Sequence, residues 1–343
     1  MKVTIKDVAR EAGVSPSTVS RALQDSPRIS PEVRARVREI AQRLNFHPNQ
    51  MARSLVNRQS RIIGIVFPDE AGMNLGNPFY PAVLQGIGHV ASEKGYQMLL
   101  ITGGGGVTAA EAARSTAAGG YVAGLVLLAA EVEQPQHTGV PMVVIGHPVN
   151  APECYCVDNA NVCAGYEATR FLLDNGHERI LLLGFDAKFM FTVDRREGYA
   201  QALQEAGIAV REDWIVSGRP VRYPEESAEL CRLFQSPDHP TAVVCMDDLL
   251  AIGLHRLLSS NGMRVPEDVS LISFNNNETC RYHTPPLTTF DVEPYHLGVS
   301  AMTLMMDVLS GAVTQPVSID VPFTLIRRQS VAKIGPSIPK KEI

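Results

Sequence analysis

Two polar residues directly follow apolar runs of the sequence, at positions from which they could hold a small polar ligand. Asp247 follows the run TAVVCM, and Asn275 follows VSLISF. If both runs are strands of a parallel sheet, these residues lie at strand carboxyl ends, where such sheets bind their ligands. Carboxylate and amide oxygens there could accept hydrogen bonds from hydroxyl groups. The structural alternatives are a helix cap for Asp247 and a turn residue for Asn275.

Aromatic residues occupy comparable positions. Phe79 and Tyr80, in NPFY, begin a helix after the first apolar run, so an aromatic face there could stack on a sugar ring or a base. Phe189 and Phe191 follow the run RILLLG in a predicted loop, where two exposed rings would be unfavourable unless they line a cleft. Core packing is the alternative for Phe79 and Tyr80. For Phe189 and Phe191 the alternative is packing between two lobes of the protein. His147, after PMVVIG, could reach the cleft or serve only as a strand-end residue.

The sequence lacks the usual signatures of catalysis. The run GGGG at 103–106 is not followed by Lys and Ser or Thr, so it is not a phosphate-binding P-loop. Neither a GxSxG elbow nor an HExxH helix occurs. The six cysteines form no CxxC pair and the histidines are scattered, so we expect reduced thiols and no metal site. The prediction is a binding protein that uses no cofactor, rather than an enzyme.

The elements that would position these residues are strands and helices in alternation. From Arg61 onward, apolar runs alternate with amphipathic segments, which is typical of parallel sheets covered by helices on both faces. The runs are RIIGIVF, YQMLLIT, YVAGLVLL, PMVVIG, RILLLG, TAVVCM and VSLISF. Trp214, in the loop EDWIV, is expected to pack. With 343 residues the chain is long enough for a small head and two such lobes.

The first 45 residues predict three short helices. Thr4 can cap the first, with Asp7 at the capping-box position, and Gly13 ends it. Ser15-Pro16 and Ser30-Pro31 each supply a cap and a first-turn proline for the next helix. The apolar residues at helical spacing are Val33, Val37, Ile40, Ala41 and Leu44, faced by Val8, Ala12, Val19 and Leu23. The order helix, glycine turn, helix predicts a helix-turn-helix, whose second helix reads the DNA major groove.

The charge is divided unevenly along the chain. The net charge is −5, yet residues 1–61 hold 12 Lys and Arg against 5 Asp and Glu, whereas the remainder holds 19 against 31. A basic module binds a phosphate backbone by releasing counterions, and an acidic body is repelled from it. No apolar stretch has the length of a signal peptide or membrane span. We therefore expect a cytoplasmic protein without membrane contact.

Longer motifs make the helix-turn-helix interpretation specific. The segments TIKDVAREAGVSPSTVSRAL and RISPEVRARVREIAQRLNFHPNQMARSL are followed, in order, by NPFY, VDN, NGHERI, RREGY, DDLLAIG and PPLTTFD. On these motifs the chain resembles the lactose-repressor (LacI/GalR) family over essentially its whole length. The resemblance implies an all-α helix-turn-helix head and an α/β periplasmic-binding-protein-like core of two parallel-sheet lobes.

The resemblance also implies the DNA contacts. Pro16 and Ser17 occupy the positions of the family's main base-discriminating pair, and Arg21 that of a further groove contact. A proline offers only apolar contact, for instance to a thymine methyl, whereas a serine can donate or accept. The expected phosphate anchors are Thr4, Ser15, Thr18 and Ser20, with simple helix capping as the alternative for Ser15.

Residues 46–60 resemble the family's hinge helix. Such a short helix is not stable alone and needs a partner to fold. Leu55 takes the position of the side chain that wedges into the minor groove at the operator centre, with Asn49, Ala52 and Arg53 beside it. Packing on the body is the alternative for Leu55. Because two hinge helices must pair, we expect a homodimer on double-stranded, near-palindromic operator DNA.

In the body, Arg195 of RREGY matches the family's ligand-binding arginine and could donate a forked pair of hydrogen bonds. A surface salt bridge is the alternative. The resemblance implies a sugar effector in a cleft between the lobes. The runs FNNN, VVIGHP and PDEAGMNLGNPFY resemble the branch of maltose or α-glucoside regulators, although many family members carry Asp where this chain has Asn275.

Together these observations give one hypothesis about organisation and function. The predicted parts are a head at 1–45, a hinge and linker at 46–60, a body at 61–333 and a tail at 334–343, with lobe 1 at about 61–160 and 291–320 and lobe 2 at about 161–290 and 321–333. The predicted function is a repressor of a carbohydrate-utilisation operon, released when a sugar closes the lobes. A purine-dependent or phosphocarrier-dependent co-repressed regulator remains open, as does a transport-type sugar-binding protein, which the basic head disfavours.

Overall fold

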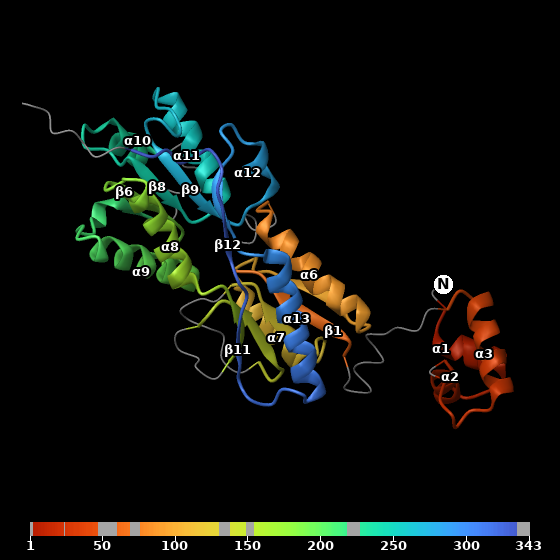
Figure 1. The fold of residues 1–343 in the computed structure, drawn as a ribbon. Helices are drawn as coiled ribbons and strands as arrows, with labels where there is room; N and C mark the ends of the chain where they lie inside the picture. The colour runs from red at the N-terminus through yellow and green to blue at the C-terminus, as the bar shows by residue number, and fades with distance from the viewer. Residues whose placement is uncertain are drawn as a thin grey trace, which may run out of the picture. The chain divides into compact units, whose positions relative to one another are not determined.

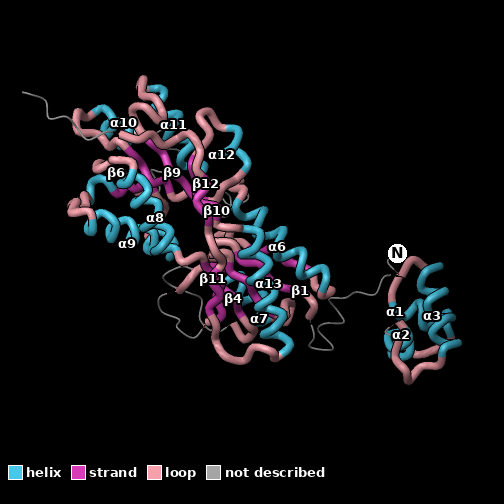
Figure 2. Tube along the Cα trace, viewed as in Figure 1, coloured by secondary structure: helices cyan, strands magenta, loops and turns pink. Residues whose placement is uncertain are grey.

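The chain folds as two compact units, which we describe separately. The computed structural model describes residues 3–23, 25–46, 60–68, 76–129, 138–148, 154–217 and 227–334. The first unit, Met1–Ser60, contains the predicted head, and the second, Arg61–Ile343, contains the predicted body. Figures 1 and 2 show the helical head and the mixed helices and sheets of the body.

The head contains α1 (Ile5–Ala12), α2 (Pro16–Ala22) and α3 (Pro31–Arg43), as its capping residues predict. Ser15 caps α2 by accepting a hydrogen bond from the Thr18 amide at 3.1 Å. Gly13 ends α1 in the left-handed region, at φ +66°. The buried core is Val8, Ala9, Ala12, Val19, Ala22, Val37, Ile40 and Ala41. The three helices therefore enclose the predicted apolar stripes.

Lobe 1 of the body is a six-stranded parallel sheet in the order β11-β5-β4-β3-β1-β2. Its strands are β1 (Ile62–Val66), β2 (Gln97–Ile101), β3 (Gly124–Leu127), β4 (Met142–Ile145), β5 (Tyr155–Asp158) and β11 (Ser318–Asp320). Helices α6 (Phe79–Glu93) and α13 (Pro294–Ser310) cover one face, and α7 (Ala109–Ala118) covers the other. Alternate residues of β1 accordingly enter two different cores.

Lobe 2 repeats this arrangement with a sheet in the order β12-β10-β9-β8-β6-β7, in which only β12 is antiparallel to its neighbour. Its strands are β6 (Ile180–Leu183), β7 (Ile215–Val216), β8 (Ala242–Cys245), β9 (Ser270–Phe274), β10 (Thr288–Asp291) and β12 (Thr324–Ile326). Its helices are α8 (Asn161–Asp174), α9 (Met190–Glu205), α10 (Ala228–Gln235), α11 (Asp248–Ser260) and α12 (Glu278–Tyr282). Helices α8 and α9 cover one face of the sheet, and α10 and α11 cover the other.

All seven predicted apolar runs are strands, and the α/β prediction for the body is confirmed. Trp214 is buried in the core of lobe 2, as predicted. Within the described residues, no helix has the length and apolar character that crossing a membrane requires.

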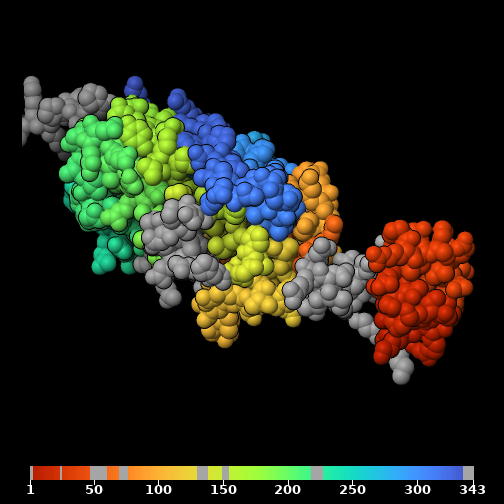
Figure 3. Space-filling view, turned by 90° about the horizontal axis from the view of Figure 1, so that it is seen from below, coloured from red at the N-terminus to blue at the C-terminus, as the bar shows by residue number. Residues whose placement is uncertain are grey.

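The chain passes between the lobes at 159–160, at 292–293 and at 321–323. Figure 3 shows the C-terminal residues, in blue, lying between the green of lobe 2 and the orange of lobe 1. Asn159 lies in the first crossing and is only 4% exposed. Its side-chain amide donates to the carbonyls of Val292 and Val321, both at 3.0 Å. A single carboxamide therefore joins all three crossings.

In each lobe, two helices approach so closely that only glycine fits at their contact. A Cβ atom on Gly198 of α9 would lie 1.9 Å from the Val162 carbonyl oxygen of α8. A Cβ atom on Gly298 of α13 would lie 2.1 Å from the Val83 carbonyl oxygen of α6. Because the obstructing atoms belong to the backbone, the helices themselves would have to move apart.

We expect Gly198→Ala to lower the free energy of unfolding by about 1–3 kcal/mol or more, because it forces α8 and α9 apart. Urea unfolding of the full chain measures the change. Gly88→Ala is the matched control, since Gly88 lies in α6 and its added Cβ would meet only the flexible end of Met98, at 3.3 Å. There the better helix propensity of alanine, about 1 kcal/mol, should leave stability equal or higher. If both variants lost the same free energy of unfolding, the close contact between the backbones of α8 and α9 would not explain the effect of Gly198→Ala.

Candidate functional site

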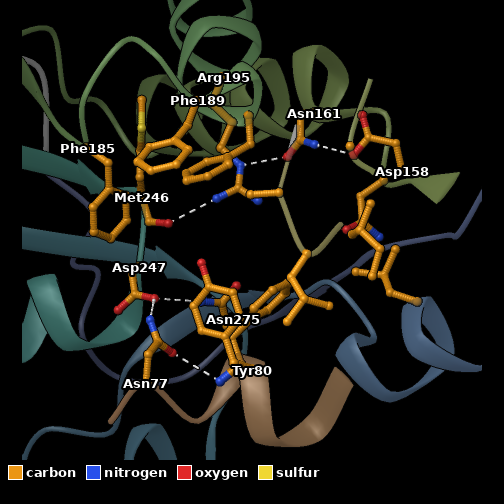
Figure 4. Close-up of a pocket in the computed structure, with 18 of the residues that line it drawn as sticks. Asn77, Tyr80, Asp158, Asn161, Phe185, Phe189, Arg195, Met246, Asp247 and Asn275 are labelled. Carbon is orange, nitrogen blue, oxygen red and sulfur yellow. Dashed lines mark hydrogen bonds between the residues drawn. The ribbon is translucent and has the colours of Figure 1, made fainter. Parts of the chain in front are cut away.

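A pocket lies between the two lobes of the body (Figure 4). Its volume is about 180 Å³, whereas one water molecule needs only about 10–15 Å³. Its aromatic lining residues are Phe79, Tyr80, Phe185, Phe189 and Phe191. Its polar lining residues are Asn77, Asp158, Asn159, Asn161, Arg195, Asp247 and Asn275. The pocket can therefore enclose a small organic molecule with both apolar faces and polar edges.

The sequence-based candidates for this pocket converge in the structure with one exception. The predicted residues that line it are Phe79, Tyr80, Phe189, Phe191, Arg195, Asp247 and Asn275. His147 does not line it. Its neighbour Gly146, at φ +108°, presents its backbone to the pocket, while His147 is exposed and its Nδ1 atom lies 4.0 Å from the Cys156 sulfur.

The aromatic rings come from both lobes. In lobe 2, Phe189 and Phe191 stack with centroids 5.7 Å apart and an interplanar angle of 16°. Phe189 is the extended N-cap that precedes α9, so it lies in the predicted loop, whereas Phe191 belongs to the first turn of α9, where a loop was wrongly expected. In lobe 1, Phe79 and Tyr80 meet edge to face at 5.3 Å. Phe79 also packs against the cores of both lobes, so core packing and pocket lining hold together for this residue.

Arg195 is the central cation of the pocket, and it is buried rather than part of a surface ion pair. It is 5% exposed, its Nε donates to Asn161 Oδ1 at 2.8 Å, and its Nη1 donates to the Met246 carbonyl at 2.9 Å. The guanidinium carbon lies 4.1 Å from the centre of the Phe274 ring. Burial lowers the pKa of Arg195 to about 10, so the side chain remains a cation at neutral pH.

Asp247 joins the lobes through its carboxylate. Oδ2 accepts from Asn77 Nδ2 of lobe 1 at 2.8 Å and from Asn275 Nδ2 of lobe 2 at 2.7 Å, as Figure 4 shows. Oδ1 accepts from the Leu249 amide at 2.7 Å and so caps α11. Asn275 has φ +103°, which suits a turn residue. Asp247 and Asn275 therefore fill the predicted structural roles and line the pocket as well.

A second hydrogen-bonded chain crosses between the lobes at the opposite side of Arg195. Asp158, at the end of β5, accepts from Asn161 Nδ2 at 2.7 Å, and Asn161 in turn accepts from Arg195. Burial raises the pKa of Asp158. Four polar residues of the pocket were not predicted as site residues: Asn77, Asp158, Asn159 and Asn161. The motifs NPFY and VDN contain the first three, but β5, with the sequence YCVD, has no long apolar run and was not recognised as a strand.

Asp194 is half-buried beside Arg195, and burial together with the charge of Asp158 raises its pKa to about 6. Since its ordinary value is 3.8, the folded protein binds this proton more tightly than the unfolded chain. Its contribution to stability is complete below about pH 3.8 and disappears as the pH rises through about 6. Asp194→Asn, which cannot ionise, should therefore raise the melting temperature more at about pH 7.5 than at about pH 5.

Thermal unfolding at the two pH values measures this difference. Asp174→Asn serves as the control, because Asp174 ends α8 with its side chain 61% exposed. The control should shift the melting temperature equally at both pH values. An Asp194→Asn shift that does not depend on pH would contradict the raised pKa.

In the head, Pro16, Ser17 and Arg21 are exposed on α2, where they could reach a partner. Ser15 is exposed as well, and its hydroxyl lies 2.8 Å from that of Ser17 and 2.9 Å from that of Thr18. Thr4 is exposed and donates to Asp7 through both its amide and its hydroxyl. Ser20 is partly buried. The predicted hinge contacts Asn49, Ala52, Arg53 and Leu55 lie outside the described residues.

Comparison with known sequences gives a match for each of the two units of the chain. Residues 4–49 match the family model "Bacterial regulatory proteins, lacI family", and residues 169–331 match the model "Periplasmic binding protein-like domain". The transcriptional regulator MalR of Streptococcus pneumoniae is 37% identical over 271 residues, which cover 78% of this chain and 82% of MalR. The transcriptional regulator CelR of Thermobifida fusca is 31% identical over 334 residues, 95% of this chain and 98% of CelR.

Solved structures agree with these relatives. A complex of the transcriptional regulator CelR with cellobiose has a TM-score of 0.73 at 30% identity and covers 96% of this chain and 99% of that one. The lac repressor dimer bound to operator and the anti-inducer ONPF has a TM-score of 0.76 and covers 97% of this chain and 100% of that one, but at 22% identity it supports only the fold. The relatives are regulators, not enzymes. The chain therefore belongs to the lacI family of bacterial regulatory proteins, and it is a DNA-binding transcriptional regulator.

Proposed function

We propose that this regulator represses a carbohydrate-utilisation operon and leaves its operator when a small sugar binds between the lobes. The observation that carries the proposal is the pocket itself, in which aromatic rings from both lobes flank a band of carboxylate, amide and guanidinium groups. Apolar ring faces and hydroxyl-bearing edges are the chemistry of a pyranose. The cellobiose complex of CelR supports a sugar as the ligand class. Maltose or another α-glucoside is the narrower candidate from the sequence motifs.

The head would bind operator DNA in the major groove through α2. Pro16 would contact a thymine methyl, Ser17 would donate to or accept from a base edge, and Arg21 would add a further groove contact. The proposed phosphate anchors are Thr4, Ser15, Thr18 and Ser20, and the proposed minor-groove contacts are Asn49, Ala52, Arg53 and Leu55. The exposure of Pro16, Ser17 and Arg21 supports this assignment.

A second copy of the chain is the proposed protein partner. Met98 and Leu100 lie on β2, the edge strand of lobe 1, and are 39% and 48% exposed. Adjacent apolar side chains on a sheet edge favour burial against another protein surface. In a dimer, sugar binding would change the relative positions of the lobes and the pairing of the hinges, with a coupling of about 1–3 kcal/mol.

The test is a titration of sugars into the complex of the full chain with a fluorescent operator selected from random DNA. Maltose or cellobiose should lower operator affinity by about 5- to 150-fold, which is the range of that coupling. A ligand that instead strengthens binding would overturn the proposed direction of control and favour a co-repressor. If no sugar changed operator affinity but a purine base or a phosphocarrier protein did, the proposal of a sugar effector would be overturned.

A further inference from the structure

We infer that the pocket between the lobes accepts uncharged, hydroxyl-bearing ligands and excludes their phosphorylated and carboxylated derivatives. This inference rests on the proposed function, because it names the charge class of the sugar that would act there. It follows from how the ionic groups of the pocket are already engaged. In particular, the described lining holds one cation against two carboxylates, and those carboxylates accept only from donors.

The cation available to an anionic ligand is Arg195. It is the sole cationic side chain among the described residues that line the pocket. Its Nε and Nη1 groups donate to Asn161 and to the Met246 carbonyl, at 2.8 and 2.9 Å. Phe274 lies against the guanidinium face. Two of the five guanidinium N–H groups are therefore engaged by the protein, which fixes the side chain in place beside the carboxylates that oppose its charge.

The acidic groups around Arg195 outnumber it. Asp158 and Asp247 line the pocket and are 8% and 3% exposed, so solvent screens their charges poorly. Asp194 and Asp248 also interact electrostatically with Arg195. A ligand anion would lose its hydration and face this excess of carboxylates, which is a repulsive element against charged analogues.

The contacts of Asp247 show which ligand groups it can receive. Burial raises the pKa of Asp247, yet its two oxygens accept from the side chains of Asn77 and Asn275 and from the Leu249 amide, which favour the carboxylate form. The backbone of Leu250 donates to this carboxylate as well, so every group that contacts it is a donor, and a ligand group placed beside it must also donate. A sugar hydroxyl supplies such a donor, whereas a phosphate dianion or a carboxylate does not.

The experiment measures binding to the full chain by calorimetry, with maltose and cellobiose as neutral probes and their 6′-phosphates as charged probes. At least one neutral disaccharide should bind, and its phosphate should bind at least about 100-fold more weakly. If a sugar 6′-phosphate bound as tightly as its neutral parent, or more tightly, the inference would be overturned, whereas the proposed function as a sugar-responsive regulator would stand. If none of the four probes binds, both the inference and the proposed sugar class fail.

A charge variant outside the lining tests the cause. Asp194 does not line the pocket, so Asp194→Asn removes a nearby negative charge without removing a ligand contact. It should narrow the ratio between neutral and phosphorylated affinities by about 3- to 10-fold while the neutral affinity stays unchanged. Asp174→Asn, at the exposed end of α8, should leave the ratio as it is in the parent chain. Equal ratios in all three proteins would show that charge does not set the selectivity and would overturn the inference.

Discussion

Replacing Arg195 by methionine should leave operator binding in place and abolish its release by sugar. The side chain lines the pocket, and its Nε and Nη1 groups hold Asn161 and the Met246 carbonyl in position on two sides of it. Methionine fills part of the volume but donates no hydrogen bond. One charge-assisted hydrogen bond from the remaining guanidinium N–H groups to a sugar hydroxyl would contribute about 1.5–3 kcal/mol, so the affinity for the sugar should fall at least about tenfold. Calorimetry gives the affinity, and the operator titration gives the response.

Arg195→Lys separates charge from geometry. Lysine keeps the positive charge among Asp158, Asp194 and Asp247, but its single ammonium cannot span Asn161 and Met246 as the planar fork does. It should keep most of the stability and regain only part of the sugar affinity. Urea unfolding of both variants shows how much of any loss comes from the fold. If the methionine variant released operator at the same sugar concentration as the wild type, Arg195 would not contribute to effector binding.

The local elements could be predicted because their signals are short-range. Ser15-Pro16, Ser30-Pro31 and Gly13 mark helix ends through hydrogen bonds within three residues or through a backbone conformation that glycine favours. The seven long apolar runs became strands because a parallel strand covered on both faces is apolar throughout. Strands of two to four residues at the lobe edges, such as β7 and β12, have no such run, and their pairing depends on the rest of the sheet.

The pocket was only partly predictable for a related reason. Asp247 and Asn275 follow recognisable strands, and topology alone brings them to the same edge. Asn77 was missed because its role depends on Asp247, which lies 170 residues away along the chain. Likewise, Asn159 acts through the carbonyls of Val292 and Val321, and backbone carbonyls leave no trace in a sequence.

Replacing two neighbouring aspartates by alanine should affect different properties: Asp248→Ala should mainly lower stability, and Asp247→Ala should mainly lower sugar affinity. Asp247 faces the pocket, whereas Asp248 is completely buried and accepts hydrogen bonds from Ser273, Thr289 and the Asn277 amide at 2.6, 2.7 and 2.9 Å. Burial raises the pKa of Asp248 to about 6, but its removal leaves three donors unsatisfied in the core. Asp248→Ala should therefore lower the free energy of unfolding by about 3 kcal/mol or more, at about 1–3 kcal/mol for each of the three orphaned donors.

Asp247→Ala should lose only the helix cap, about 1 kcal/mol, because the amides of Asn77 and Asn275 can turn to water or to a ligand in the pocket. Its sugar affinity should nevertheless fall at least about tenfold, since both the interlobe hydrogen bond and the acceptor for a hydroxyl are gone. At a temperature where both proteins are folded, Asp248→Ala should bind the sugar with nearly wild-type affinity. Urea unfolding measures the stability of both variants, and calorimetry measures their affinity for the sugar. The assignment would be contradicted if Asp247→Ala lost mainly stability and Asp248→Ala lost mainly sugar affinity.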